Sequence, residues 1–202
     1  MTHDEALSLV KQYVKNENSI KHMLATEAIM KALARRFNEN EETWGLAGLL
    51  HDMDMEILSE FPDSNNSTRN KMEIVDWKTH PEQQGAVGAD MLDKMGVDKI
   101  ITNAIRAHNE ATGKTRDNLI EKAIFATDPL TGLIVASTLV LPSRKIGGLT
   151  PENVLNRFRE KSFAKGARRE AIASCSEINL TLEEFVKIGL VTMQEIASDL
   201  GL

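Results

Sequence analysis

The segment GLAGLLHDMD, residues 45–54, is an apolar run that ends in an adjacent histidine and aspartate, His51 and Asp52. Consecutive side chains on a helix lie about 100° apart around its axis, so both of these can point into the protein interior. A buried carboxylate needs a partner. A divalent cation is such a partner, because it accepts nitrogen and oxygen ligands together.

Apolar residues recur at helical spacing on both sides of this segment, as in Leu182, Phe185 and Leu190. Alternating strand patterns are scarce, which predicts an all-α fold. Pro129 lies inside the periodic stretch 119–141, where we expect a kink or a break between two helices. The expected helices cover residues 3–16, 19–37, 41–52, 81–95, 97–108, 117–127, 129–141, 151–158, 166–177 and 181–199.

Length and composition favour a single soluble domain. The chain has 202 residues, of which 42% are hydrophobic and 27% charged, and this excludes wholesale disorder. The stretch 61–71 is rich in turn formers, so we expect a surface loop there that is suited to act as a lid. We interpret Trp44 and Trp77 as packing residues.

Charge and cysteine content limit the location and the partners. The single cysteine, Cys175, cannot form an intramolecular disulfide, and it has no histidine beside it to suggest a catalytic thiol. The first residues lack the basic and apolar regions of a secretory signal, and no apolar run is long enough to span a bilayer. We therefore expect a cytoplasmic protein without membrane contact. The net charge of −6 disfavours general nucleic-acid binding.

Four histidines recur at nearly even intervals of 28 or 29 residues, which predicts that successive ones face one cavity; they are His22, His51, His80 and His108. Asp128 sits in the small and apolar stretch AIFATDPLTGLIVA, where an ionised carboxylate is disfavoured without a cation. We interpret Asp128 as a further metal ligand. His3, near the chain end, is assigned no role.

This ordered set of six residues resembles the HD superfamily of metal-dependent phosphohydrolases. The phrases LLHDMD, THPEQQG, IRAHNE and ATDPLTGLIVA carry the resemblance, which extends from about Ser19 to the carboxyl terminus. It implies a single all-α HD-type domain over residues 1–202 with roughly eight to ten helices. Its metal-binding core would cover about residues 19–141, and a C-terminal helical part about residues 142–202.

The resemblance also implies a ligand set and a reaction. His22, His51, Asp52 and Asp128 would hold one divalent metal, and His80 and His108 a second, with Asp52 bridging the two. Two such ions can clamp the attacking and leaving oxygens of a phosphoryl transfer and supply hydroxide at neutral pH. The expected substrate is a phosphomonoester or phosphodiester of a small molecule or nucleotide. Whether the metal is Fe, Mn, Mg, Zn, Co or Ni is left open, as is the oligomeric state.

Two departures from the family limit the reaction. The cyclic-dinucleotide branch resembles HDIGK, whereas this chain has Asp54 and Met55 at the last two positions and lacks the lysine. The GYP motif of that branch is also absent, so we do not expect cleavage of cyclic dinucleotides. Asp54 and Glu56 are candidates to orient a ligand imidazole, and the alternative is that one of them is merely solvated.

A basic segment follows the predicted metal-binding core. The candidate residues for binding a substrate anion are Arg144, Lys145, Lys161, Lys165 and Arg168. Their side chains match phosphate chemistry, and the alternative is a solvated helix face. Asp52 and Glu110 are the candidate catalytic residues, with Glu110 as a proton carrier next to the His108 segment. The alternative is that Glu110 is a surface residue at a helix end without a catalytic role.

Two other functions remain open. Some HD proteins with a similar histidine-rich set resemble di-iron oxygenases, which would require iron and oxygen. A non-catalytic module is the other alternative, in which the metal contributes folding energy or senses a ligand.

Overall fold

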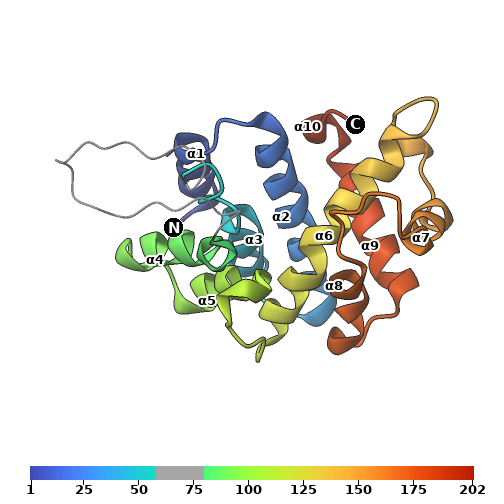
Figure 1. Ribbon diagram of the computed structural model, residues 1–202. Coiled ribbons are helices and arrows are strands. Elements are labelled where there is room, and N and C mark those ends of the chain that lie inside the picture. The colour runs from blue at the N-terminus through green and yellow to red at the C-terminus, as the bar shows by residue number, and fades with distance from the viewer. Residues whose placement is uncertain (58–79) are drawn as a thin grey trace.

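The computed structural model describes residues 1–57 and 80–202, and every regular element within these ranges is a helix (Figure 1). The predicted all-α fold is confirmed. The expected lid at residues 61–71 and Trp77 lie outside the described residues. None of the helices in the described part combines the length and the apolar character needed to cross a bilayer.

Before α6, the described residues form five α-helices and two short 3-10 helices: α1 (His3–Tyr13), α2 (Glu17–Phe37), α3 (Glu41–Leu50), η1 (Pro81–Gln83), α4 (Ala86–Lys94), α5 (Lys99–His108) and η2 (Glu110–Thr112). The second half contains α6 (Leu119–Leu139), η3 (Ile146–Gly148), α7 (Pro151–Arg159), α8 (Arg169–Ala173), η4 (Ser174–Ile178), α9 (Leu182–Glu195) and α10 (Ala197–Leu200). The structure divides three of the expected helices: residues 81–95 become η1 and α4, residues 166–177 become α8 and the directly following η4, and residues 181–199 become α9 and α10.

Polar side chains fix where the helices begin. The Asn16 side chain accepts hydrogen bonds from the first backbone N–H groups of α2, and the Asn40 side chain does the same for α3. Thr2 and Glu5 form a capping box at α1. Such caps satisfy backbone donors that have no partner inside the helix, and they stabilise a helix by about 0.5–2 kcal/mol each.

Helix α6 crosses the middle of the molecule, with α2, α3 and α5 on one side and α7, α8 and α9 on the other (Figure 1). It continues unbroken through Pro129, so the expected division into residues 117–127 and 129–141 is wrong. Proline removes one helix hydrogen bond, here to the carbonyl of Phe125, but Pro129 is buried among neighbouring helices that hold the segment helical. The continuous helix keeps Asp128 in the interior, next to α2.

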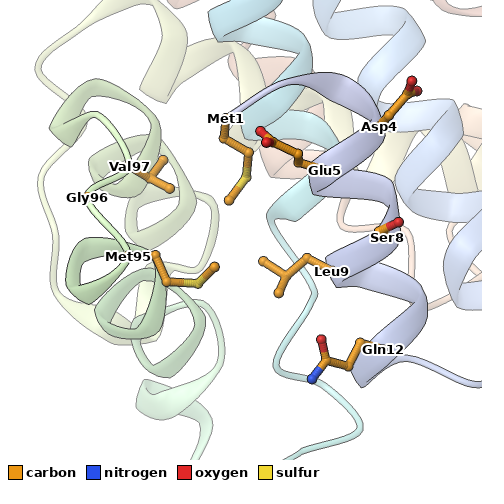
Figure 2. A pocket seen from close by; sticks show the side chains of 9 residues that line it. All are labelled: Met1, Asp4, Glu5, Ser8, Leu9, Gln12, Met95, Gly96 and Val97. Atoms are coloured by element: carbon orange, nitrogen blue, oxygen red, sulfur yellow. The ribbon is translucent and has the colours of Figure 1, made fainter.

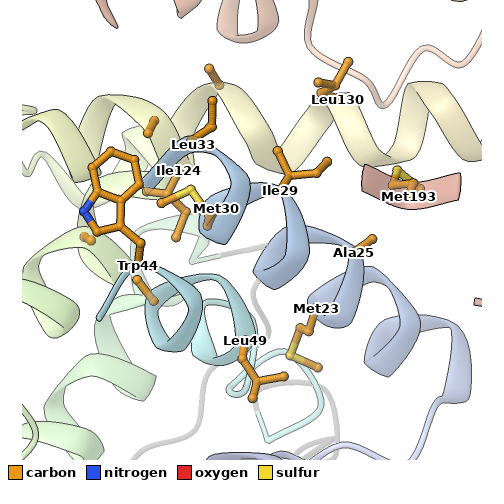
Figure 3. Packing of buried hydrophobic residues seen from close by; sticks show 14 of the residues in the cluster. Met23, Ala25, Ile29, Met30, Leu33, Trp44, Leu49, Ile124, Leu130 and Met193 are labelled. Atoms are coloured by element: carbon orange, nitrogen blue, oxygen red, sulfur yellow. The ribbon is translucent and has the colours of Figure 1, made fainter. Parts of the chain in front are cut away.

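The core lies between α2, α3, α6 and α9 (Figure 3). Met23, Ile29 and Leu33 of α2 are fully buried, and Ile124 and Leu130 of α6 pack in the same cluster. Trp44 at the start of α3 is also buried, as predicted for a packing residue. Burial of this kind supplies about 1.5–3 kcal/mol for each large apolar side chain, and it holds the ends of α3 and α6 against α2.

Candidate metal centre

Helix α3 delivers His51 to the centre because it lies unusually close to α2. A Cβ atom at Gly48 would lie 2.8 Å from the Cα and N atoms of Glu27, so only glycine permits this approach. The Nδ1 atom of His51 donates a hydrogen bond to the Gly48 carbonyl at 2.8 Å. As a result, the Nε2 atoms of His51 and His22 lie 3.1 Å apart, although they come from different helices.

A threonine on α6 orients His22. The Thr131 hydroxyl donates its proton to the Asp128 backbone carbonyl at 2.8 Å. The same oxygen therefore accepts a hydrogen bond from the Nδ1 atom of His22, which lies 2.8 Å away. With one ring proton held on Nδ1, the Nε2 atom of His22 faces Asp52 and Asp128.

Four side chains meet at this point, and we call them the His–Asp cluster: His22, His51, Asp52 and Asp128. The Nε2 atom of His22 lies 3.4 Å from Oδ2 of Asp52 and 3.2 Å from Oδ1 of Asp128. The Nε2 atom of His51 lies 3.3 Å and 3.8 Å from the same two oxygens. The fold thus brings together the four residues predicted to share one metal.

The buried charges in the cluster change the acidity of its members. Burial alone would lower the pKa of His22, but its hydrogen bonds to Asp128 and Asp52 raise it to about 9. Burial would raise the pKa of Asp52 and of Asp128, but the neighbouring imidazoles outweigh burial and hold both below the usual aspartate range. In the absence of a metal, protons on the imidazoles compensate the two carboxylates.

The donor set fits a divalent metal ion. Ligand atoms of His22, His51 and Asp52 all lie within 4.8 Å of one another. The Nδ1 atoms of both histidines are occupied by hydrogen bonds to a carbonyl and a hydroxyl, which leaves both Nε2 atoms as ligands. Two imidazoles with carboxylates form a mixed nitrogen and oxygen set that suits Zn²⁺, Fe²⁺, Mn²⁺, Co²⁺ or Ni²⁺.

His108 borders the cluster from the end of α5. It is buried, and its Nδ1 atom donates to the Ile105 carbonyl at 2.5 Å. Its Nε2 atom lies 3.4 Å from Oδ1 of Asp52, on the opposite carboxylate oxygen from His22 and His51. The Gln84 side-chain amide donates to the same Oδ1 at 3.0 Å. Asp52 therefore presents one oxygen to each of two groups of partners, as a bridging carboxylate would.

The structure does not bring His80 to this place. Its side chain is 47% exposed, and its Nδ1 atom pairs with Glu82 at 2.9 Å. His80 stands directly before η1, so its neighbour in this arrangement is an exposed carboxylate of the same turn. Among the described residues, the second ligand set is thus reduced to His108 and Asp52, and a second metal remains a prediction.

Of the predicted anion-binding residues, Arg168 is the one that reaches the cluster. Its Nη2 atom lies 3.8 Å from Oδ2 of Asp128 and donates to the His108 carbonyl at 3.5 Å. Glu110 is 68% exposed, and its Oε2 atom lies 3.7 Å from Nη1 of Arg168. Glu110 therefore lies beside the cluster, with Arg168 between them. Among the described residues, no contact joins Glu110 to the metal ligands.

The other four basic candidates are exposed, and no described contact joins them to the cluster; they are Arg144, Lys145, Lys161 and Lys165. The first two lie in the turn before η3, and the other two in the loop after α7. These four side chains are therefore solvated, which is the alternative to anion binding, because their segments lie at the surface and leave the long side chains in water.

Arg169 holds the loop that carries Arg168, and sequence reasoning missed it. Its guanidinium donates hydrogen bonds to six backbone carbonyls between Arg157 and Ala167. These contacts replace the partners that the irregular segment lacks. The Arg168–Arg169 pair was visible in the sequence, but its two residues look alike until the backbone places one toward the cluster and the other into the loop.

Asp54 and Glu56 both bind backbone, so the interpretation of one of them as merely solvated is wrong. Oδ2 of Asp54 accepts hydrogen bonds from Gly85 and Gly88, both at 2.8 Å, at the start of α4. Burial raises the pKa of Asp54 to about 6, although the Gly88 N–H opposes this. Glu56 accepts from the N–H groups of Lys15 and Asn16 at 2.6 and 2.7 Å.

Asp54 acts on His108 through the backbone. Gly85 has φ +79°, and a Cβ atom there would lie 2.8 Å from Cε1 of His108. The carboxylate that anchors Gly85 therefore fixes the surface against which the imidazole packs. Cys175 has no comparable role: it is buried, and burial raises the pKa of its thiol to about 11, which disfavours a nucleophilic thiolate.

Two hollows differ in their relation to the cluster. Figure 2 shows the larger, about 730 Å³, which lies between α1 and the turn from α4 to α5 and is lined by Leu9, Met95 and Val97 among others. It contains none of the cluster residues. A second cavity of about 520 Å³ has His22 and Thr131 in its wall.

Comparison with known families agrees with this geometry. The family model described as HD domain matches residues 19–132, which is more than half of the chain and includes the whole His–Asp cluster. No curated protein and no solved structure matched the chain. The chain belongs to the HD domain family.

Proposed function

We propose that this protein is a metal-dependent phosphohydrolase that cleaves a phosphomonoester or phosphodiester of a small molecule or nucleotide. The family to which it belongs consists mostly of metal-dependent phosphohydrolases, and this supports the proposal. The observation that carries it is the His–Asp cluster, in which two Nε2 atoms and two carboxylates from three separate segments converge within 3.1–3.8 Å.

His22, His51, Asp52 and Asp128 would hold the ion. A bound divalent ion lowers the pKa of water and polarises a phosphoryl oxygen, which is the chemistry that phosphate hydrolysis requires. Carbonyl and hydroxyl partners fix both imidazoles before the ion arrives. This preorganisation keeps the cost of assembling the site low.

The cluster is open on one side. The side chains of His22 and Asp128 are 26% and 23% exposed, whereas those of His51 and His108 are buried. A substrate therefore reaches the cluster past α2 and α6. The net charge of −6 favours a small anionic substrate over a long nucleic acid.

Arg168 and Glu110 lie where they can act on a phosphate ester. The guanidinium of Arg168 offers a planar pair of donors to phosphate oxygens, and its contacts with the His108 carbonyl, Glu110 and Asp128 are long, at 3.5–3.8 Å, so a phosphate can compete for these donors. Glu110 is solvent-exposed beside it, so its carboxyl group can exchange a proton with water and with a departing alcohol.

Metal content and turnover test the proposal together. After reconstitution with Mn²⁺, Fe²⁺, Co²⁺, Ni²⁺ or Zn²⁺, elemental analysis should find at least one ion per chain, and aryl phosphates or a nucleotide panel should be hydrolysed. Asp52→Asn should lower both the metal content and the turnover. Asp4→Asn is the matched control, because Asp4 is 97% exposed on α1.

Less than one ion per chain together with no turnover would contradict the proposal. Activity that requires iron and consumes oxygen would instead establish the oxygenase alternative. If chelation unfolds the protein and a broad metabolite panel is left unchanged, the metal has a structural or sensing role.

A further inference from the structure

The cavity of about 520 Å³ that shares His22 with the cluster lies between α2, α6 and α10. Its size falls within the range of about 300–1,000 Å³ that is usual for small-molecule sites. His22 contributes its Nε2 atom to the cluster and also forms part of the cavity wall. A group that fills the cavity is therefore one imidazole ring away from the reacting centre.

The cavity wall is aliphatic. Ala25 from α2, Val135 and Leu139 from α6 and Leu200 from α10 supply its apolar surface. Besides His22 and Thr131, its polar side chains are those of Asn18 and Lys21, and the described residues that line it include no phenyl, phenol or indole ring. Nucleobases are usually held by aromatic stacking and by several directed hydrogen bonds, so this lining fits an alkyl group better than a base.

Small residues of α6 create the space. Gly132 and Ala136 lie one helical turn apart, and both line the cavity. A Cβ atom at Gly132 would meet nothing within 4 Å, so the volume beside it is open. Leu139, further along the same helix, is 51% exposed and extends the apolar surface outward.

Asp128 connects this apolar cavity with a cationic group. Its Oδ1 atom lies 3.2 Å from Nε2 of His22, and its Oδ2 atom lies 3.8 Å from Nη2 of Arg168. The Asp128 carboxylate thus contacts His22, which forms part of the cavity wall, through one oxygen and lies near the Arg168 guanidinium with the other. A molecule bound here meets both surfaces if it has an anionic end and an apolar end.

We infer that the substrate is a phosphomonoester of an aliphatic alcohol, with its phosphate at the cluster and Arg168 and its alkyl chain in the cavity. This inference rests on the proposed phosphohydrolase function. In the reaction, a water oxygen forms a bond to phosphorus and the bond from phosphorus to the alkyl oxygen breaks. That oxygen takes up a proton and leaves as the alcohol.

Chain length provides the first test. With the metal-loaded enzyme, kcat/KM should rise from methyl to hexyl phosphate by about fourfold for each added methylene, the gain expected when a CH₂ group leaves water. Gly132→Leu and Ala136→Leu should each abolish this rise, because either leucine side chain fills the space that the alkyl chain would occupy. Gly147→Leu is the control, because Gly147 also faces open space but lies in η3, outside the cavity wall.

Binding of 1-octanol to the protein, followed by NMR chemical-shift changes, provides a second readout that needs no turnover. We expect saturable binding that Gly132→Leu and Ala136→Leu remove and Gly147→Leu preserves. Octanol binding without hydrolysis of any phosphate would contradict the proposed function and leave the apolar cavity established. Hydrolysis with equal kcat/KM along the alkyl series, or a preference for nucleoside monophosphates, would overturn the inference and leave the phosphohydrolase function standing.

Discussion

The Nδ1 atom of His22 on α2 and the hydroxyl of Thr131 on α6 lie 2.8 Å apart, and the hydroxyl proton is already given to the Asp128 carbonyl. One threonine therefore sets the tautomer of one ligand and touches the backbone of another. This contact couples the two helices that form the open side of the cluster. It also places the orientation of His22 under the control of a residue that does not itself bind the ion.

Removal of the Thr131 hydroxyl should weaken metal binding without unfolding the protein. Thr131→Val keeps the shape but leaves Nδ1 of His22 without its acceptor, so we expect metal affinity to fall by about 10–100-fold. Thr127→Val is a matched control on the same helix, because the Thr127 hydroxyl is buried and finds no hydrogen-bond partner within residues 1–57 and 80–202. Competition with a chelator of known affinity measures the difference. Equal losses in both variants would show that the Thr131 contact does not orient the ligand.

Metal affinity should rise with pH up to about 9. The pKa of His22 in the metal-free protein is about 9, since Asp128 and Asp52 outweigh burial, and the metal binds only the neutral imidazole. The neighbouring aspartates also raise the pKa of His51, so below pH 9 each binding event releases at least the His22 proton, and affinity should increase by at least about tenfold for each pH unit. Isothermal titration in buffers of different ionisation enthalpy measures this release. An affinity that is constant between pH 6.5 and 9 would contradict the assignment of His22 as a ligand.

The raised pKa of His22 should also make the metal-free fold less stable as pH rises, whereas metal affinity increases over the same range. A pKa raised above the unfolded value of 6.5 stabilises the folded state fully below that pH, and this stabilisation is lost as pH rises through about 9. The free energy of unfolding of chelator-treated protein should therefore decrease from pH 6.5 to 9. Urea unfolding at fixed ionic strength measures it, and an increase over this range would contradict the predicted sign.

Arg168 should contribute to substrate binding and not to metal occupancy. Arg168→Ala removes the guanidinium beside Asp128, so we expect KM for a phosphate ester to rise about tenfold or more with unchanged metal content. Lys145→Ala is the control, because Lys145 is exposed and no contact among the described residues joins its side chain to the cluster. A larger effect at Lys145 than at Arg168 would transfer the anion site to the turn before η3.

The close approach of α2 and α3 should depend on Gly48. Gly48→Ala places a Cβ atom 2.8 Å from the Glu27 backbone, so we expect a loss of about 1–3 kcal/mol in the free energy of unfolding and weaker metal binding. Gly132→Ala meets open space in a helix and should stabilise by about 0.5–1 kcal/mol. Urea unfolding compares the two variants. A stability of Gly48→Ala equal to that of the unmodified protein would show that the helices can separate at little cost.

Local sequence patterns predicted most of the helices, because apolar spacing reflects which face each helix buries. They failed at Pro129, where packing against neighbouring helices outweighs the local penalty of proline. They also predicted single helices over residues 81–95 and 166–177, where the structure has the 3-10 segments η1 and η4 beside α4 and α8, because short 3-10 turns carry no periodic signal. The positions of helices along the sequence do not show how closely two helices approach. The need for glycine at position 48, where α3 meets α2, is therefore visible only in the structure.

The ligands of the cluster could be predicted because a family order of histidines and aspartates marks them along the chain. The residues that orient them could not, since Thr131 and Gly85 act through short distances between segments that are far apart in sequence. The even spacing of the histidines predicted that all four face one cavity, and this is wrong for His80. It has the same interval as the others, yet it lies exposed beside Glu82. Interval length reports how many residues separate two side chains and says nothing of where each one points.

The most direct measurement is a crystal structure of the protein loaded with Mn²⁺ or Co²⁺, with the ion located by anomalous scattering. We expect an ion within about 2.0–2.3 Å of Nε2 of His22, Nε2 of His51 and the carboxylates of Asp52 and Asp128. An ion bound elsewhere, with these four side chains still paired to one another as in the metal-free arrangement, would contradict it.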